Sequence, residues 1–133
     1  MFKKKIVFVF LLLVSIGFIS AQNLTVRIEN AVIGRGYLMI AVNNNEADFP
    51  NTGFRVLRIA VTDQVMVVVF SNLPMGQYAV SVYQDANDNG KLDTNIFGIP
   101  TEKYGFSNGI RMPNWNKCVF DFNGDKTITI QLK

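Results

Sequence analysis

Apolar and polar residues alternate with a period of two along most of the chain, a pattern typical of β-strands with one buried face. The alternation is clearest at residues 24–29, 37–42 and 78–83, where every second side chain is large and apolar. No segment keeps a helical period over three turns. The pattern predicts seven strands, at residues 24–29, 37–42, 56–61, 65–70, 78–83, 117–122 and 127–132.

Turn-forming residues separate these segments. Asn123-Gly124 lies between the last two segments, and this dipeptide favours a β-hairpin because a type I′ turn needs positive φ at both central residues. Leu73-Pro74-Met75-Gly76 separates residues 65–70 from residues 78–83. Seven short strands joined by such turns predict an all-β fold. We expect a single antiparallel two-sheet sandwich of the immunoglobulin-like type, with one long ordered loop.

The first 21 residues have the pattern of a secretory signal peptide. Residues 1–5 carry three lysines, and residues 6–19 are apolar. This apolar stretch is shorter than the roughly 20 residues that a membrane-spanning helix needs. We therefore predict cleavage before Gln22, which leaves a sandwich domain at residues 22–133. An uncleaved membrane anchor is the alternative interpretation.

Removal of this segment changes the charge of the protein. The whole chain has 13 Lys and Arg against 10 Asp and Glu, but three of the lysines lie at positions 3–5, so the mature domain is formally neutral. Net charge therefore indicates neither nucleic acid nor anionic lipid as a partner, and we expect no stable membrane span after cleavage. The chain has no histidine, which excludes Ser-His-Asp triads, Cys-His pairs and histidine-ligated zinc.

The single cysteine, Cys118, excludes an internal disulfide. It shares one face of the predicted strand 117–122 with Phe120 and Phe122. We therefore interpret Cys118 as a small buried hydrophobic residue, with a reactive thiol as the alternative.

Residues 85–116 contain no clear strand and form the predicted long loop. Its first part, D-A-N-D-N-G-K-L-D at residues 85–93, matches the first nine positions of an EF-hand-type calcium loop. Ile96 stands where an EF-hand has its bidentate Glu, so we expect weak binding, with a Kd of roughly 10⁻⁴ to 10⁻³ M. An Asx-rich turn with solvated side chains is the alternative. The predicted calcium ligands are the side chains of Asp85, Asn87, Asn89 and Asp93, the carbonyl of Lys91, and either Glu102 or water.

The second part of the loop is rich in aromatic residues. One interpretation is a platform for a ring-shaped ligand or a glycan, and the other is a loop that packs its own aromatic side chains onto the sandwich. A further hypothesis pairs Glu102 with one of the aspartates as the carboxylates of a hydrolase. The candidate platform residues are Phe97, Tyr104, Phe106 and Trp115.

Two segments resemble known families. F-S-N-L-P-M-G-Q-Y-A-V at residues 70–80 resembles the turn and strand of transthyretin-like, carboxypeptidase-regulatory-like and pilin-type sandwiches, which implies an architecture and no activity. D-A-N-D-N-G-K-L-D-T-N-I-F-G-I-P-T-E-K-Y-G-F-S-N at residues 85–108 resembles the signature of a bacterial family of secreted proteins, the domain of unknown function number twenty-one forty-one. The second resemblance extends over residues 24–132 and implies export, but it brings no established activity.

The sequence thus predicts an exported, non-enzymatic binding or interaction module of the bacterial cell envelope, either periplasmic or at the cell surface. Its expected partner is a protein, a small molecule or a glycan, and its expected cofactor is calcium, bound in the long loop. A small-ligand carrier or a carboxylate-based hydrolase that uses the same loop is the alternative function.

Overall fold

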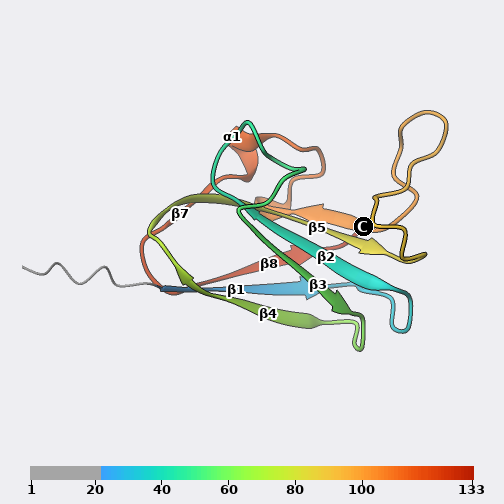
Figure 1. Ribbon diagram of the computed structural model, residues 1–133, viewed down its shortest axis with the longest axis horizontal. Helices are drawn as coiled ribbons and strands as arrows, with labels where there is room; N and C mark the ends of the chain where they lie inside the picture. The colour runs from blue at the N-terminus through green and yellow to red at the C-terminus, as the bar shows by residue number, and fades with distance from the viewer. Residues whose placement is uncertain (1–21) are drawn as a thin grey trace, which may run out of the picture.

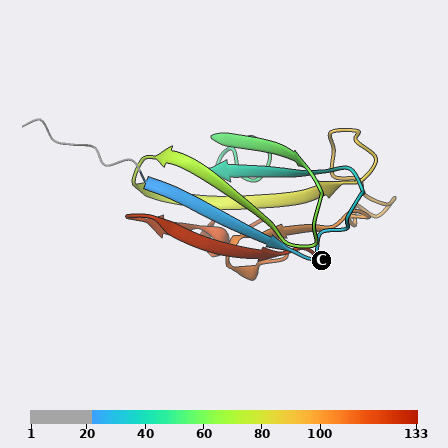
Figure 2. The same ribbon diagram turned by 90° about the horizontal axis from the view of Figure 1, so that it is seen from below.

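A computed structural model describes residues 22–133, so the predicted signal peptide lies outside the described residues. Two β-sheets pack face to face, with the ends of the strands at the left and right of the view (Figures 1 and 2). Within residues 22–133, no helix is long and apolar enough to cross a membrane. The strands are β1 (Gln22–Glu29), β2 (Tyr37–Asn43), β3 (Arg55–Ala60), β4 (Met66–Leu73), β5 (Gly76–Asp85), β6 (Tyr104–Phe106), β7 (Phe120–Phe122) and β8 (Lys126–Gln131).

The strand order confirms the two-sheet sandwich. One sheet has the order β4-β1-β8, and the other has the order β3-β2-β5-β6, with β7 also paired to β5. All seven segments with a strand pattern contain strand residues. The pairing is antiparallel throughout except between β1 and β8, which run parallel.

The predicted hairpin at Asn123-Gly124 is wrong. β7 pairs with β5 in one sheet, whereas β8 pairs with β1 in the other, so the chain crosses between the sheets at this point. Accordingly, neither Asn123 nor Gly124 has positive φ. The crossing lets Phe122 and Ile130 enter the common core from different sheets, and both are buried. Burial of both apolar strands has therefore overridden the local turn preference.

The predicted long loop, residues 85–116, is interrupted by regular structure. β6 adds a short strand to the edge of β5, a 3₁₀ turn follows at Ser107–Gly109, and a single helical turn, α1, covers Trp115–Cys118. Cys118 thus ends a helix instead of lying in a strand over residues 117–122. Its side chain is fully buried, as its apolar surroundings in the sequence predicted.

The alternation of side chains produces two cores. The main core fills the space between the sheets and includes Leu24, Val26 and Ile28 of β1 with Leu38, Ile40 and Val42 of β2, all fully buried. A smaller cluster covers the opposite face of β5. It consists of Ala79, Phe106 and Cys118, with Phe49, Tyr104, Ile110 and Trp115 packed against it.

Candidate functional site

The loop between β5 and β6 projects beyond the ends of the strands at one end of the sandwich (Figure 1). Thr94 and Pro100 form a β-bridge that divides it into two parts. We call residues 95–99 the tip, and residues 85–94 with 100–103 the base. The base carries the predicted calcium ligands, and the tip is the part farthest from the sheets.

Asp85 organises the start of the base. Its carboxylate is fully buried and accepts hydrogen bonds from the backbone N–H groups of Asn89, at 3.1 Å, and Gly90, at 2.8 Å. Asp88 and Gly90 have positive φ, at 55° and 75°, which closes the turn around this carboxylate. Asp at position one and Gly at position six of the motif therefore form the tight turn that their spacing predicts.

Three other predicted ligands converge beside this turn. The carboxamide nitrogens of Asn87 and Asn89 donate to the two carboxylate oxygens of Asp93, at 2.6 and 2.7 Å. The carboxamide oxygen of Asn89 accepts a further bond from the backbone N–H of Lys91, at 3.0 Å. The side chains at positions 87, 89 and 93 therefore meet around one carboxylate.

Glu102 closes the base from the returning side of the loop. One carboxylate oxygen accepts from the backbone N–H of Ala86 and the other from that of Asp93, both at 3.0 Å. Glu102 thus ties together the two ends of the calcium-like segment. Because both of its oxygens and both oxygens of Asp85 bind backbone N–H groups, these two carboxylates hold a turn and are not directed at a common reacting atom.

The base offers the hard oxygen atoms that calcium prefers, but few of them are carboxylates. Rotation of the Asn87 and Asn89 carboxamides by 180° would replace both nitrogens with oxygens facing Asp93. Within residues 22–133, no group of three or more Asp, Glu, Cys or His side chains is arranged to hold a metal ion. The residues therefore fit a weak calcium site that depends on amide oxygens.

Asn95 shapes the tip. Its side-chain oxygen accepts from the backbone N–H groups of Phe97, at 2.9 Å, and Ile99, at 3.0 Å. Its backbone pairs with Ile99 O at 2.8 Å and Gly98 N at 3.0 Å, and Gly98 has φ of 77°. An Asn followed three residues later by Gly is a recognisable turn signal, although the sequence analysis did not use it.

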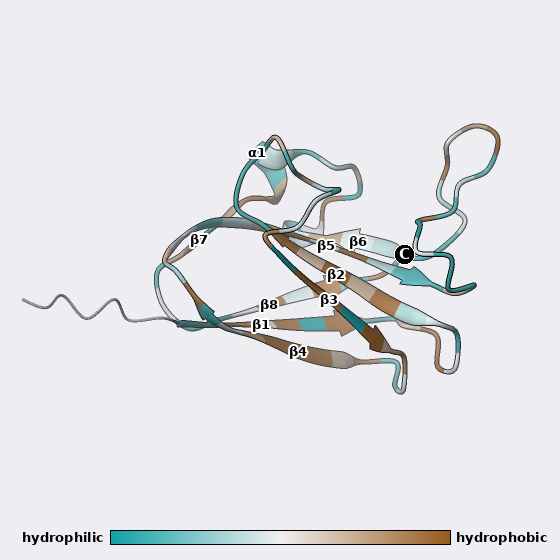
Figure 3. Cartoon of the chain, viewed as in Figure 1, coloured by the Kyte–Doolittle hydropathy of each residue, from teal (hydrophilic) through white to brown (hydrophobic). Residues whose placement is uncertain are grey.

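The tip displays apolar side chains to solvent. Ile96 is 93 % exposed, Phe97 80 % and Ile99 59 %. The hydropathy colouring shows this as a brown end on the projecting loop (Figure 3). Four backbone hydrogen-bonding groups are satisfied within the tip itself, so the apolar display is built on an ordered turn.

Side chains from the sheets anchor the base. The Tyr83 hydroxyl donates to the carbonyl of Gly90 at 3.1 Å. Burial raises the pKa of Tyr83 above its ordinary value, and the negative charges of Asp85 and Glu102 raise it further. Arg58 of β3 pairs with Asp88, and its guanidinium lies 3.4 Å from the centre of the Tyr37 ring. Sequence reasoning missed Arg58 and Tyr83 because they reach the loop only through sheet pairing.

The four candidate platform residues do not lie together. Tyr104 and Phe106 stack edge to face at 5.9 Å, and Phe49 contacts both Phe106 and Trp115, each at 5.9 Å. These three candidates pack into the smaller core cluster. Phe97 is at the exposed tip instead. The arrangement favours a self-packed loop over a flat aromatic platform.

Comparison with known proteins adds a family and no activity. No curated protein and no solved structure matches the chain, so the transthyretin-like architecture stays a prediction. A family model described as an uncharacterized protein conserved in bacteria, DUF2141, matches residues 26–131. This range includes both sheets and the whole loop between β5 and β6. The chain therefore belongs to the uncharacterized bacterial family DUF2141.

Proposed function

We propose that this protein is an exported, non-enzymatic binding module of the bacterial cell envelope, and that it contacts its partner through the tip. The observation that carries the proposal is the combination of exposure and order at Ile96, Phe97 and Ile99. Large apolar side chains exposed together are typical of interaction sites. The signal-peptide pattern of the first 21 residues and the bacterial family support the proposed location.

Burial of the tip would provide a useful binding energy. Removing a large apolar side chain from water contributes about 1.5–3 kcal/mol, and Ile96 and Phe97 are almost fully available for such burial. A tip already ordered by Asn95 would lose less conformational entropy on binding than a flexible loop of the same composition. We therefore expect the partner to offer an apolar pocket or groove.

Photo-crosslinking in the native host tests this proposal. Phe97 is replaced with the photo-reactive amino acid benzoylphenylalanine, and the control places the same residue at Val67, an apolar position of β4 that is 57 % exposed. We expect a discrete adduct from position 97 that is lost when Ile96→Ser is added. Identical adducts from both positions, or adducts from position 67 alone, contradict binding through the tip.

We further propose that calcium strengthens the base of the loop. The support is the meeting of Asn87, Asn89 and Asp93 around one point and the calcium-type spacing of the motif. At ten times its Kd, an ion that binds only the folded protein stabilises it by about 1.4 kcal/mol, which raises the melting temperature by several degrees. We expect this rise with millimolar calcium relative to EDTA, and not with magnesium.

The variant for the calcium test must spare the hydrogen bonds of the loop. Asp85→Ala is unsuitable because the carboxylate of Asp85 accepts two backbone N–H bonds, so its loss destabilises the turn with or without calcium. Asp93→Asn keeps the shape and removes one charge. We expect Asp93→Asn to abolish the calcium shift. Equal melting temperatures in calcium, magnesium and EDTA contradict the metal site and leave binding through the tip intact.

A further inference from the structure

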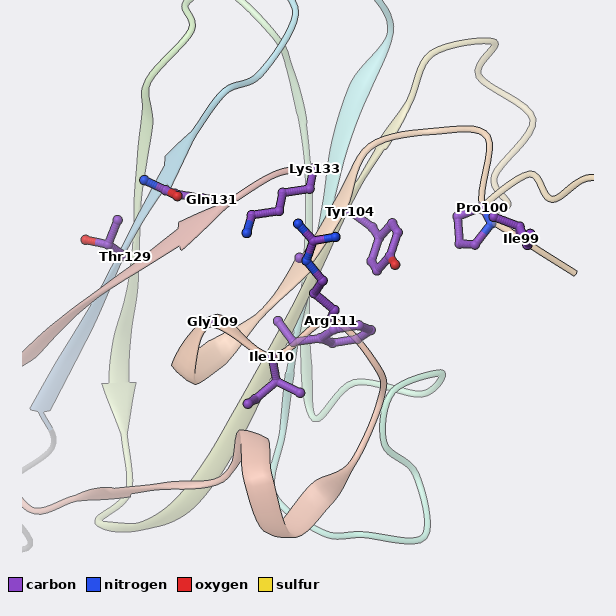
Figure 4. Close-up of a pocket in the computed structure, with 11 residues that line it drawn as sticks. Ile99, Pro100, Tyr104, Gly109, Ile110, Arg111, Thr129, Gln131 and Lys133 are labelled. Atoms are coloured by element: carbon purple, nitrogen blue, oxygen red, sulfur yellow. The ribbon is translucent and has the colours of Figure 1, made fainter.

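A pocket of about 410 Å³ lies between β6 and the end of β8, outside the base of the loop (Figure 4). Its volume falls in the range of small-molecule sites. The pocket is bordered on one side by Ile99 and Pro100, where the tip returns to the base. The side chains that define it are Tyr104, Ile110, Arg111, Thr129, Gln131 and Lys133.

Gly105 allows the two walls of this pocket to approach each other. A Cβ at this position would lie 2.7 Å from Cγ2 of Ile130 and 2.9 Å from the carbonyl oxygen of Gln131. Next to it, the backbones of Tyr104 and Lys133 exchange hydrogen bonds at 3.2 and 3.0 Å. The pocket is therefore part of the sandwich framework, and its position depends on a contact between the two sheets.

The charged side chains that line the pocket are both cationic. They are Arg111 and Lys133, and no carboxylate side chain lines the pocket. Within residues 22–133, neither cationic group has a hydrogen bond or ion pair with another side chain. The neighbouring acid, Glu29, is already bound by Arg27 at 3.0 Å and by Gln131 at 3.1 Å. Two unneutralised cations beside one cavity create a positive potential there.

The remaining lining is suited to an apolar group. The Tyr104 ring is half-buried and is held edge to face against Phe106 at 5.9 Å, and Ile110 is also half-buried. The close-up shows the Tyr104 ring and the nitrogen atoms of Arg111 and Lys133 pointing toward the same space (Figure 4). Arginine provides a planar fork of donors for an oxyanion, and lysine adds a point charge.

We propose that this pocket binds a small molecule that carries an oxyanion, either phosphate or carboxylate, on a ring or a short apolar group. The oxyanion lies between Arg111 and Lys133, and the apolar part packs on Tyr104 and Ile110. This site is independent of the proposed function, because it requires neither calcium nor insertion of Ile96 and Phe97 into a partner.

Titration of ¹⁵N-labelled protein tests the site. The probes are phenyl phosphate, inorganic phosphate, and benzyl alcohol as a neutral ring. We expect phenyl phosphate to shift the backbone amide signals of Gly109, Ile110, Arg111 and Thr129 saturably, and to bind more tightly than either of the other probes. Absence of a saturable shift, or equal affinity for inorganic phosphate or benzyl alcohol, overturns the proposal.

Charge-removing variants separate a built site from general attraction. Arg111→Gln and Lys133→Gln should each weaken phenyl phosphate binding by about tenfold or more, because each removes a charged donor. Arg55→Gln, at an exposed arginine of β3 outside the pocket, is the matched control and should change the affinity by less than about twofold. Equal losses in all three variants overturn the proposal, because they indicate binding to surface charge alone.

Discussion

The Glu102→Gln variant gives the sharpest test of how the loop is held. Glu102 is the side chain that joins the two ends of the calcium-like segment, through its bonds to the N–H groups of Ala86 and Asp93 at 3.0 Å. Gln keeps the size of the side chain but replaces one acceptor oxygen with an NH₂ group. That NH₂ group would face a backbone N–H, so one bond is lost and two donors are brought together.

The expected cost follows from these contacts. A hydrogen bond to a charged group contributes about 1.5–3 kcal/mol. Water can replace part of this here, since Ala86 is exposed and Glu102 is half-buried. We therefore expect a loss of about 1–2 kcal/mol in the free energy of unfolding, which corresponds to a fall in melting temperature of about 4–8 °C.

Glu46→Gln is the matched control, because Glu46 is exposed and its carboxylate makes no hydrogen bond within residues 22–133. It should leave the melting temperature unchanged. Amide hydrogen exchange adds a local readout, and Ala86 and Asp93 should exchange faster in Glu102→Gln than in the wild type. Equal melting temperatures for the two variants, with unchanged exchange at Ala86 and Asp93, would refute the stapling role of Glu102.

Three further predictions concern the framework. Gly36→Ala should cost about 3 kcal/mol or more, because its Cβ would lie 1.9 Å from a backbone oxygen at the end of β5 at a φ of 59°, whereas Gly34→Ala, at a φ of 72° with nothing within 4 Å, should cost about 1–2 kcal/mol in urea unfolding. Burial raises the pKa of the Cys118 thiol, so a thiol reagent should modify it only after unfolding in guanidinium; fast reaction in the native state would contradict this packing. Burial also raises the pKa values of Tyr78 and Tyr83, so the folded state favours the neutral phenols and the free energy of unfolding should fall as the pH rises above about 10. Tyr83→Phe should make this fall smaller, and an unchanged pH dependence would contradict the assignment to Tyr83.

The sandwich could be predicted because apolar alternation reports directly on which face of a strand is buried. Leu24, Val26 and Ile28 alternate with polar residues, and all three are fully buried. Asn123-Gly124 misled the prediction because a turn preference is worth less than burial of the strands on either side. β6 was missed because three residues carry too little pattern, and this strand forms where the edge of β5 provides backbone partners.

The candidate site was predicted in part. The tight turn from Asp85 to Gly90 follows from local spacing, so the sequence was sufficient to locate it. Glu102 was expected near this turn, but its bonds to backbone N–H groups depend on how the loop returns and carry no local signal. Arg111 and Lys133 could not be paired from sequence, because the contact of β6 with the end of β8 brings them to one pocket.

The central claim is that the tip is an ordered element that holds apolar side chains in solvent. Backbone ¹⁵N relaxation at Phe97, Gly98 and Ile99 tests this claim most directly, since the hydrogen bonds to Asn95 fix these amides. We predict order parameters of about 0.8, close to those of the strands. Values below about 0.6 at these amides would show a flexible loop and would contradict the claim.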